Sequence, residues 1–399
     1  MKIKILIILL LTMFCTGCYN YHELSDFAIV TGIGVDKDEE RFKVSVMIAN
    51  ASSVSSSSKE GDSSTTVITG TGKTITDAIT DIEKIVPKDL YTGHLSAIVI
   101  SDKLAYEGLY DILSAIMRNP ESIKKLFLII AKESESVDIL KTLSPLENFP
   151  TQNIVTNLKT SDTILGTTTD VMMSTFIVNM LDEGIENILP TITINGNKNE
   201  ADNVDDLKNS EVKGELKLNN LAIFKNDKLI DYADEDISKG INIINNQAIS
   251  TELFLPCYKN LDKYLVLKID TPKTKINLDI ENNKLKYTLN VTGTGSINET
   301  NCKLDLNDPK VIENINNSAS AEIYDLINNS VNEVFKYKSD IFGLGNILYK
   351  KDPKLWKKLE KDWNNNLDKL DIKVESKINI KSKGSLKNTL KDELDNAKD

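Results

Sequence analysis

Hydrophobic residues alternate with polar or small ones near the start of the chain. The alternation runs from Phe42 to Ile48, and a second apolar segment, 28–36, precedes it. A period of two residues is typical of a strand that buries one face. The pattern therefore predicts a strand over 41–49 beside a strand over 28–36.

The pattern then changes to a helical period. Ile75, Ala78 and Ile82 recur three or four residues apart, and Pro87 ends the repeat. Further apolar segments predict a strand at 95–100, a helix at 104–117 and a strand at 126–131. Strands that alternate with helices indicate an α/β layer.

The last third of the chain carries the clearest pattern. Alternating apolar residues on both sides of the turn 281–284 predict an antiparallel hairpin with one apolar face. Asp308-Pro309 and Asp352-Pro353 each predict the start of a helix, because aspartate caps a helix and proline suits its first turn. Alternation from Ile372 to Ile380 predicts a closing strand.

The predicted fold class is α+β, and 399 residues are enough for two or three domains of ordinary size. The C-terminal domain is expected to be an antiparallel sheet with long helices on one face. A Ser-rich loop and a polar tail interrupt or follow these units. The boundaries are 1–17 for a signal peptide, 18–193 for the N-terminal domain with the loop at 52–64, 194–262 for a middle region with a hairpin around 225–228, and 263–399 for the C-terminal domain with the tail from Lys381.

The N-terminus has the pattern of a secretory signal. Lys2 and Lys4 precede the apolar run 5–14, which is too short to span a bilayer core of about 30 Å. Thr16-Gly17 before Cys18 resembles a bacterial lipobox, although Cys15 stands where leucine is usual. We predict cleavage before Cys18 and acylation of its thiol, which places the body outside the cytoplasm.

The charge excludes some partners. The chain carries 48 basic and 59 acidic residues, a net charge of −11. Loss of Lys2 and Lys4 with the signal peptide leaves 46 basic against 59 acidic residues, or −13. A surface of this sign repels nucleic acid and argues against a polybasic membrane clamp. Acyl chains would attach such a body to a membrane without any electrostatic attraction to lipid headgroups.

Cysteine and histidine are scarce. Cys257 and Cys302 are the cysteines of the body, and His22 and His94 are the two histidines. We interpret the cysteines as two separate half-buried thiols, with a disulfide between them as the alternative. With so few ligands, we predict neither a metal site nor a cofactor.

Motifs with known chemistry are incomplete. The segment 70–74 lacks the first glycine of a phosphate loop, because Val67 stands there. Gly32 and Gly34 lack the third glycine of a dinucleotide fingerprint. We interpret the acidic run 36–40 as a solvated turn and His94 as a structural, hydrogen-bonded residue rather than a catalytic base. No catalytic residue is predicted, and the chain is not expected to be an enzyme.

Several stretches, taken in order, resemble a known family. The segment from Cys18 through Ala28-Ile29-Val30-Thr31-Gly32-Ile33-Gly34-Val35-Asp36 resembles the start of mature Ger(x)C lipoproteins, the C subunits of spore germinant receptors. Other matching stretches are 72–78, 94–108, 118–120, 221–225, Asp340-Ile341-Phe342-Gly343-Leu344-Gly345 and Trp356 with Trp363. The chain departs from the family at Tyr19-Asn20, where Trp-Asp is common.

The resemblance implies a function that the residues alone do not show. Such proteins have three α/β-type domains and are anchored on the outer face of the spore inner membrane. They assemble with two multi-pass membrane subunits into a receptor that responds to small nutrients and triggers germination. The resemblance implies no catalysis, and Cys18 is the one chemically defined site that we predict.

A second function class stays open at this point. A solute-binding lipoprotein would capture a small ligand itself and deliver it to a permease. That alternative predicts two lobes that close on a polar cleft.

Overall fold

The computed structural model describes most of the chain. The described residues are 24–50, 64–118, 125–147, 149–164, 166–203, 205, 212–257, 260–282 and 284–382, without the side chains of 161–164 and 260–262. Cys18, the predicted signal peptide and most of the Ser-rich loop and polar tail lie outside them.

The first half of the described chain builds one mixed sheet of nine strands. Its order is β3-β2-β1-β5-β6-β7-β8-β9, and β4 pairs with β1 beyond this path. The strands β1, β5, β6 and β7 run parallel, and antiparallel pairs extend the sheet on either side. The bounds are β1 Phe27–Asp38, β2 Arg41–Ala49, β3 Thr65–Gly72, β4 Asp89–Tyr91, β5 Ala97–Ser101, β6 Phe127–Ala131, β7 Ile188–Gly196, β8 Gly214–Lys225 and β9 Lys228–Tyr232.

Helices cover both faces of this sheet, which is why its central strands are apolar throughout. Every residue of β5 and β6 is buried, as expected for parallel strands between two helical layers. Ile98 and Ile100 belong to one hydrophobic core and Val99 to the other. The first core includes helices α3 Ile75–Glu83, α4 Asp102–Glu107, α5 Tyr110–Met117 and α8 Met173–Leu181, and the second includes α6 Ser136–Lys141 and α7 Pro150–Ile164.

The prediction of a single helix over 104–117 is wrong in one respect, because the segment forms two helices. Gly108 separates α4 from α5 with a φ of +132°, which favours glycine. Asp227 of the β8–β9 turn approaches at this point: its carboxylate accepts from Tyr110 N at 3.0 Å, and its carbonyl accepts from Leu109 N at 3.0 Å. A contact over more than a hundred residues therefore breaks a pattern that is locally helical.

The second sheet has four strands, and two of its three strand pairings are antiparallel. Its order is β10-β11-β12-β13. β13 pairs parallel with β12, so the prediction of a purely antiparallel sheet is wrong at this edge. The reason is the helical connection from β12 to β13, since a crossover of that kind returns the chain in its original direction. The bounds are β10 Ser250–Cys257, β11 Asn260–Glu281, β12 Lys284–Thr300 and β13 Asp371–Ser382.

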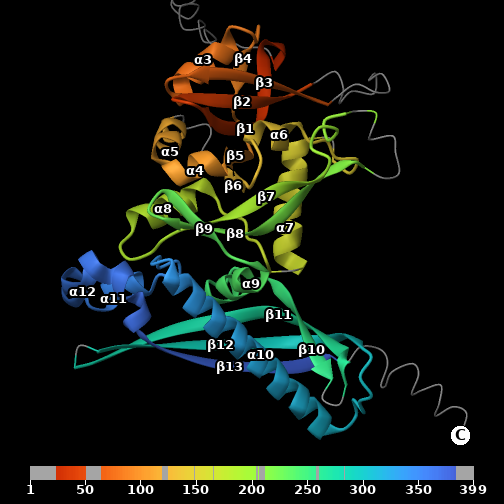
Figure 1. Ribbon diagram of the computed structural model, residues 1–399, viewed down its shortest axis with the longest axis vertical. Coiled ribbons are helices and arrows are strands. Elements are labelled where there is room, and N and C mark those ends of the chain that lie inside the picture. Colours follow the sequence, from red (N-terminus) through yellow and green to blue (C-terminus); the bar gives the residue numbers. More distant parts are fainter. Residues whose placement is uncertain are drawn as a thin grey trace, which may run out of the picture.

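Helix α10 (Pro309–Lys336) crosses one face of the second sheet (Figure 1). Its N-cap is Asp308, whose carboxylate accepts from Lys310 N at 2.9 Å, as the sequence predicts. Ile315, Ile323 and Val334 are among its buried residues, which recur at helical spacing. The connection to β13 then contains α11 Leu344–Lys351, α12 Pro353–Leu359 and the 3-10 helix η4 Glu360–Lys369.

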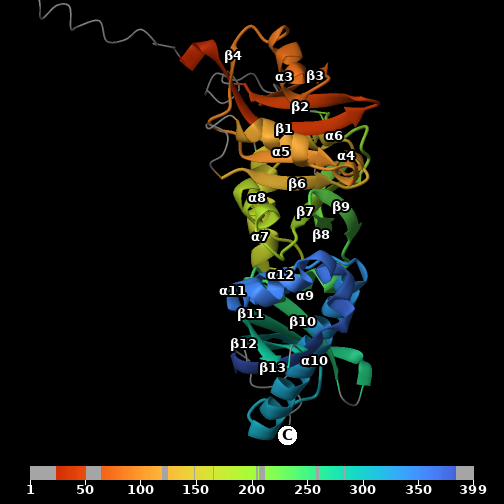
Figure 2. The ribbon, with the colours of Figure 1, turned by 90° about the vertical axis from the view of Figure 1, so that its left-hand side faces the viewer.

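The two sheets follow one another along the long axis of an elongated molecule (Figures 1 and 2). Helix α9 (Glu235–Ile244) lies between them, and a single hydrophobic core joins Leu221 of β8, Ile241 of α9 and Leu267 of β11. A short 3-10 helix, η1 (Leu24–Asp26), opens the described chain. The mixed α/β class that the sequence predicts is confirmed, while the division into three domains stays a prediction.

Candidate functional site: the Asp340 junction

A fully buried carboxylate lies where the two halves of the molecule meet. Asp340 follows α10, and its side chain is inaccessible to solvent. Its carboxylate accepts hydrogen bonds from Leu344 N at 3.0 Å, from Gly345 N at 2.7 Å and from Trp363 Nε1 at 2.7 Å. The first two donors are backbone groups at the start of α11, which lack partners within a helix. Asp340 therefore fixes the start of α11 and holds η4 against it.

Burial raises the pKa of Asp340 above the ordinary aspartate value, and the hydrogen bonds from Gly345, Trp363 and Leu344 oppose that rise. The same environment affects Tyr287 of β12, whose hydroxyl donates to Leu344 O at 2.9 Å. Burial, and then the charge of Asp340, raise the pKa of Tyr287. The carboxylate is thus part of a polar network within a largely apolar core.

Two tryptophans pack over a glycine beside this carboxylate. The rings of Trp356 and Trp363 lie 5.3 Å apart in an edge-to-face arrangement. A Cβ on Gly345 would lie 2.7 Å from Trp356 Cζ3 and 2.8 Å from Trp363 Nε1. Asp340, Gly345 and the two tryptophans are therefore one packed unit, although they are dispersed in the sequence.

The N-terminal half contributes the loop between α8 and β7. Glu183 accepts from Trp356 Nε1 at 3.0 Å through its carboxylate and from Asn346 Nδ2 at 2.9 Å through its carbonyl. Gly184, with a φ of +68°, accepts from Asn346 N at 2.9 Å. A Cβ on Gly184 would lie 2.5 Å from the backbone of Gly345. The two halves therefore approach each other backbone to backbone.

Glu186 adds a second, half-buried carboxylate to this contact. Its carboxylate accepts from Asn226 N at 2.6 Å and from Asn364 Nδ2 at 2.9 Å, and its own N–H donates to Asp340 O at 2.9 Å. Burial raises the pKa of Glu186, and the nearby charge of Asp340 raises it further. We call the whole contact the Asp340 junction, defined as residues 183–186, 339–346, Trp356, Trp363 and Asn364.

A cleft lies beside the junction. Its volume is about 320 Å³, and its lining includes Glu186, Asn187, Asn245, Gln247 and Phe342. Polar and apolar side chains are both present, as in many small-molecule sites between domains. A larger cleft of about 560 Å³ lies at the ends of β1, β5 and β6 and is lined mainly by charged residues.

The acidic run 36–40 contains a residue that the sequence interpretation misplaced. Glu39 and Glu40 form the predicted exposed turn, but Asp36 is buried. Its carboxylate accepts from Ser136 N and from Ser136 Oγ, both at 2.7 Å. Burial raises the pKa of Asp36, and the bonds from Ser136 lower it. No local signal identifies Asp36, because its partner is a hundred residues away.

The glycines of the incomplete motifs have structural reasons to be glycine. A Cβ on Gly34 would lie 2.5 Å from Ser136 Oγ, and one on Gly32 would lie 2.2 Å from Thr151 Cγ2. A Cβ on Gly70 would lie 2.4 Å from the carbonyl oxygen of Ala78 in α3. These positions let helices pack closely on the sheet, in agreement with the interpretation that they are not nucleotide-binding loops.

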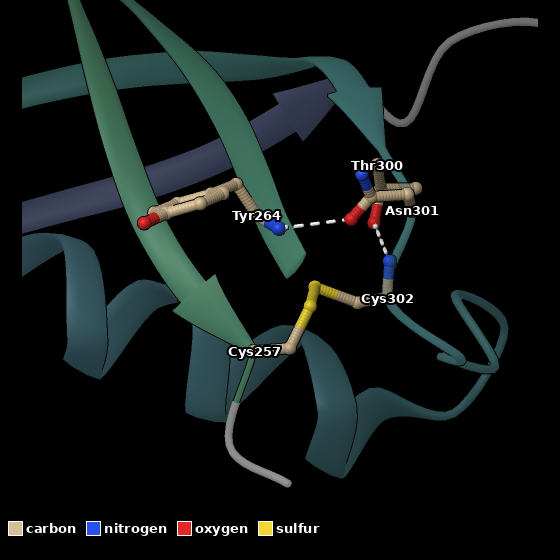
Figure 3. Close-up of a disulfide and its surroundings, with 5 residues drawn as sticks. All are labelled: Cys257, Tyr264, Thr300, Asn301 and Cys302. Atoms are coloured by element: carbon tan, nitrogen blue, oxygen red, sulfur yellow. Dashed lines mark hydrogen bonds between the residues drawn. A yellow bond between two sulfur atoms is a disulfide. The ribbon is translucent and has the colours of Figure 1, made fainter. Parts of the chain in front are cut away.

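The two cysteines of the body form a disulfide, so the interpretation as separate thiols is wrong. The bond joins Cys257, at the end of β10, to Cys302, just after β12, with 5.6 Å between the Cα atoms (Figure 3). Tyr264 N donates to Asn301 Oδ1 at 2.8 Å beside it, and Cys302 N donates to Thr300 Oγ1 at 3.1 Å. Strand pairing through β11 brings the two cysteines together over 45 positions, which spacing alone does not reveal.

The other predicted site residues contribute no cluster. His94 is exposed, with its ring 5.9 Å from that of Tyr91, and Cys18 and His22 lie outside the described residues. Within the described ranges, no group of three or more histidine, cysteine or acidic residues could hold a metal ion. In the same ranges, no helix is long and apolar enough to cross a membrane.

These observations define a two-sheet α/β protein whose halves are joined by a buried polar junction. Two family models match the chain in order. Residues 20–194 match the spore germination protein N-terminal domain, and residues 219–384 match the spore germination B3/GerAC-like C-terminal domain. The chain belongs to this family of spore germination proteins, as the sequence resemblance indicates, and its members are C subunits of germination receptors.

Relatives cover almost the whole chain. Spore germination protein KC of Bacillus subtilis (strain 168) is 24% identical over 96% of both chains. Putative spore germination protein YfkR of the same organism is 23% identical, over 97% of this chain and 98% of its own. Spore germination protein GerQC of Bacillus cereus is 21% identical, over 95% and 98%.

A solved structure supports the fold. The crystal structure of the GerBC protein matches with a TM-score of 0.52 and 15% sequence identity, over 88% of this chain and 96% of that one. At this identity the likeness concerns the fold alone.

Proposed function

We propose that this chain is the lipid-anchored subunit of a spore nutrient germinant receptor. It lies on the outer face of the spore inner membrane, attached through acyl groups on Cys18. The observation that carries the proposal is the ordered match of both family domains to residues 20–194 and 219–384. The lipobox-like Thr16-Gly17-Cys18 supports the anchor, and several acyl chains make such attachment stable.

In this proposal the subunit assembles with two multi-pass membrane subunits and takes part in signalling without catalysing a reaction. The Asp340 junction suits that role. Hydrogen bonds from both halves meet there within one hydrophobic core, so the two sheets can present partner contacts in one fixed arrangement.

Affinity purification from spore membranes tests the proposal. Spore inner membranes are solubilised in mild detergent, and the protein is captured through a C-terminal tag. Two multi-pass subunits should co-purify with the wild-type chain. The Cys18→Ala variant should lose both the membrane fraction and these partners.

The control is Glu83→Gln, which changes an exposed side chain and leaves Cys18 and the Cys257–Cys302 disulfide in place. It should stay in the membrane fraction and keep its partners. Recovery of the wild-type protein alone, or with a transport permease, would contradict the assignment.

The cleft beside the Asp340 junction favours one second candidate. A solute-binding lipoprotein would hold a small polar ligand there, where about 320 Å³ is available. Calorimetry of the mature chain with amino acids and sugars separates the two functions. Micromolar binding that Glu186→Ala abolishes would favour the solute-binding function, whereas no heat of binding is expected for the assembly subunit.

A further inference from the structure

Lysines concentrate on the segment that contains α11 and α12. Between residues 350 and 362 six lysines stand against three acidic residues, Asp352, Glu360 and the exposed Asp362. All six lysine side chains are exposed. They are Lys350, Lys351, Lys354, Lys357, Lys358 and Lys361.

The segment keeps a net charge of +3. Lys357 pairs with Glu360 at 2.9 Å, and Lys351 donates to the carbonyl of Leu278. The Asp352 carboxylate caps α12 and accepts from Lys354 N and Leu355 N. The remaining four lysines, Lys350, Lys354, Lys358 and Lys361, have no ion pair with any described residue.

The N-terminal half of the molecule has the opposite sign. Residues 24–232 contain 20 basic and 32 acidic residues, a net charge of −12. This nearly equals the net charge of the whole chain, −11. The basic segment is therefore a local exception, and the whole-chain charge conceals it. Screening limits each charge to a range of about 8–10 Å at physiological salt, so distant acidic residues do not cancel it.

Exposed apolar side chains lie on α5 and α8. Tyr110 is 66% exposed, Met117 47%, Val178 61% and Leu181 76%. A shallow groove between the two helices is lined by Leu113, Ile177 and Met180 together with Arg118. Large apolar side chains that cluster on a surface mark a contact with a partner or a membrane.

The helices that carry these apolar and basic side chains lie on the same side of the molecule. In Figure 1, α5, α8, α11 and α12 all lie on the left-hand side, while α6 and α7 lie on the right. Figure 2 turns that side toward the viewer and shows α5 above α8, with α11 and α12 side by side further down the long axis. We call this surface the basic flank, defined by α5, α8, α11 and α12.

We propose that the basic flank rests on a phospholipid bilayer with anionic headgroups. The lysines between residues 350 and 361 bind lipid phosphates, and the apolar side chains of α5 and α8 enter the headgroup layer. Lysines beside exposed aliphatic and aromatic side chains are typical of surfaces that lie in a membrane interface. The combination favours lipid over an acidic protein, because a purely electrostatic protein contact does not need protruding Leu181 and Val178.

The inference rests on the proposed location at a membrane surface, and its test is independent of the acyl anchor and of partner subunits. Residues 18–399 carrying Cys18→Ala are sedimented with vesicles of equal parts phosphatidylglycerol and phosphatidylcholine, and with vesicles of phosphatidylcholine alone. We expect binding to the anionic vesicles that weakens as salt increases. Equal binding to both vesicle types, or to neither, would overturn the inference.

Two sets of variants locate the contact. Lys354→Gln, Lys358→Gln and Lys361→Gln together should weaken binding on the order of 100-fold, since each lysine near an anionic surface contributes about 1 kcal/mol. Val178→Ser with Leu181→Ser should weaken it about tenfold. All these side chains are exposed, so the fold should persist, and circular dichroism checks this.

A matched triple variant provides the control. Lys275→Gln, Lys286→Gln and Lys377→Gln remove the same charge from the exposed side of the second sheet and should leave binding within about twofold of wild type. An equal loss in this control would show a non-specific charge effect and overturn the inference. A flank variant that binds vesicles normally but fails to co-purify with the multi-pass subunits would assign the flank to a protein partner instead.

Discussion

The Asp340 carboxylate shows how much structure can depend on one side chain. It has no contact with solvent, and its three donors come from the backbone of α11 and from an indole of η4. A buried donor that loses its acceptor costs about 1–3 kcal/mol. The residue is therefore a structural centre of the molecule, which its position in a short glycine-containing loop does not suggest.

Asp340→Asn should lower the free energy of unfolding by about 2–4 kcal/mol, because the amide can replace only one of the two acceptor oxygens. Urea denaturation followed by circular dichroism measures the change. Asp352→Asn is the matched control: Asp352 caps α12, and asparagine caps a helix as well as aspartate does. A loss at position 340 no larger than at 352 would contradict the role of the carboxylate.

Glu186 provides a pH-dependent prediction. Burial raises its pKa above the ordinary value of 4.5. The folded chain therefore holds a proton at pH values where the unfolded chain has released it, so the free energy of unfolding falls as pH rises through that window. Glu186→Gln removes this contribution and should make the dependence shallower. Denaturation at several pH values from about 4 to 7 measures this pH dependence. The exposed Glu83→Gln is the control. If the free energy of unfolding changes with pH as steeply in Glu186→Gln as in the wild type, the effect is excluded.

Within elements, close packing decides what the hydrophobic pattern leaves open. Helix α3 approaches β3 so closely that Gly70 and Gly72 have no room for a Cβ. The disulfide joins the ends of β10 and β12 around the long strand β11. Neither the close helix–strand approach nor the disulfide can be recognised from the residues that adjoin these glycines and cysteines in the sequence.

Gly70→Ala should destabilise the protein by roughly 1–3 kcal/mol, because its Cβ would meet backbone atoms of α3 that can yield only if the helix moves. Gly293→Ala is the comparison. There the nearest atoms are methyl groups of Ile269 and Ile378, both at 3.1 Å, so a smaller loss, below about 1 kcal/mol, is expected. Thermal unfolding measures the melting temperature of both variants. Equal decreases in melting temperature would argue against tight packing between β3 and α3.

Removal of the disulfide by Cys257→Ser with Cys302→Ser should lower stability by about 4 kcal/mol. The bond closes a loop across 45 positions, and the unfolded chain gains conformational freedom without it. The wild-type protein should lose the same stability on reduction, whereas the double variant should not respond to reductant. A reductant-sensitive double variant, or a wild type that reduction leaves unchanged, would contradict the assigned pair.

For the whole molecule, the Asp340 junction makes the two halves interdependent. Trp356 and Trp363 are the two tryptophans of the chain, and both lie in this junction. Tryptophan fluorescence therefore reports on the contact between the halves, while far-UV circular dichroism reports on both sheets. One hydrophobic core runs across the contact.

We expect the fluorescence and circular dichroism transitions of the wild-type protein to coincide, as in cooperative unfolding. Glu183→Ala removes the acceptor of Trp356 Nε1 and should let the fluorescence transition begin at lower denaturant. Glu200→Ala, which lies outside the junction, serves as the control and should keep the two transitions together. Separate transitions in the wild-type protein would show that the halves unfold independently.

The local pattern was sufficient for most elements of the fold. The strands at 28–36 and 41–49, the hairpin around 281–284 and the helix that begins after Asp308 all occur where the sequence predicts them. Each depends on residues two to four positions apart, so periodicity and capping identify it. The family resemblance likewise depends on short stretches, and the comparisons confirm it.

Tertiary structure decided what depends on distant partners. The break at Gly108 requires Asp227, the burial of Asp36 requires Ser136, and the pairing of Cys257 with Cys302 requires β11 between them. The parallel edge at β13 and the shared flank of α5, α8, α11 and α12 likewise follow from chain crossovers. The sequence determined the elements and the family because those signals are local; the junction, the disulfide and the flank arise when folding brings separate segments together.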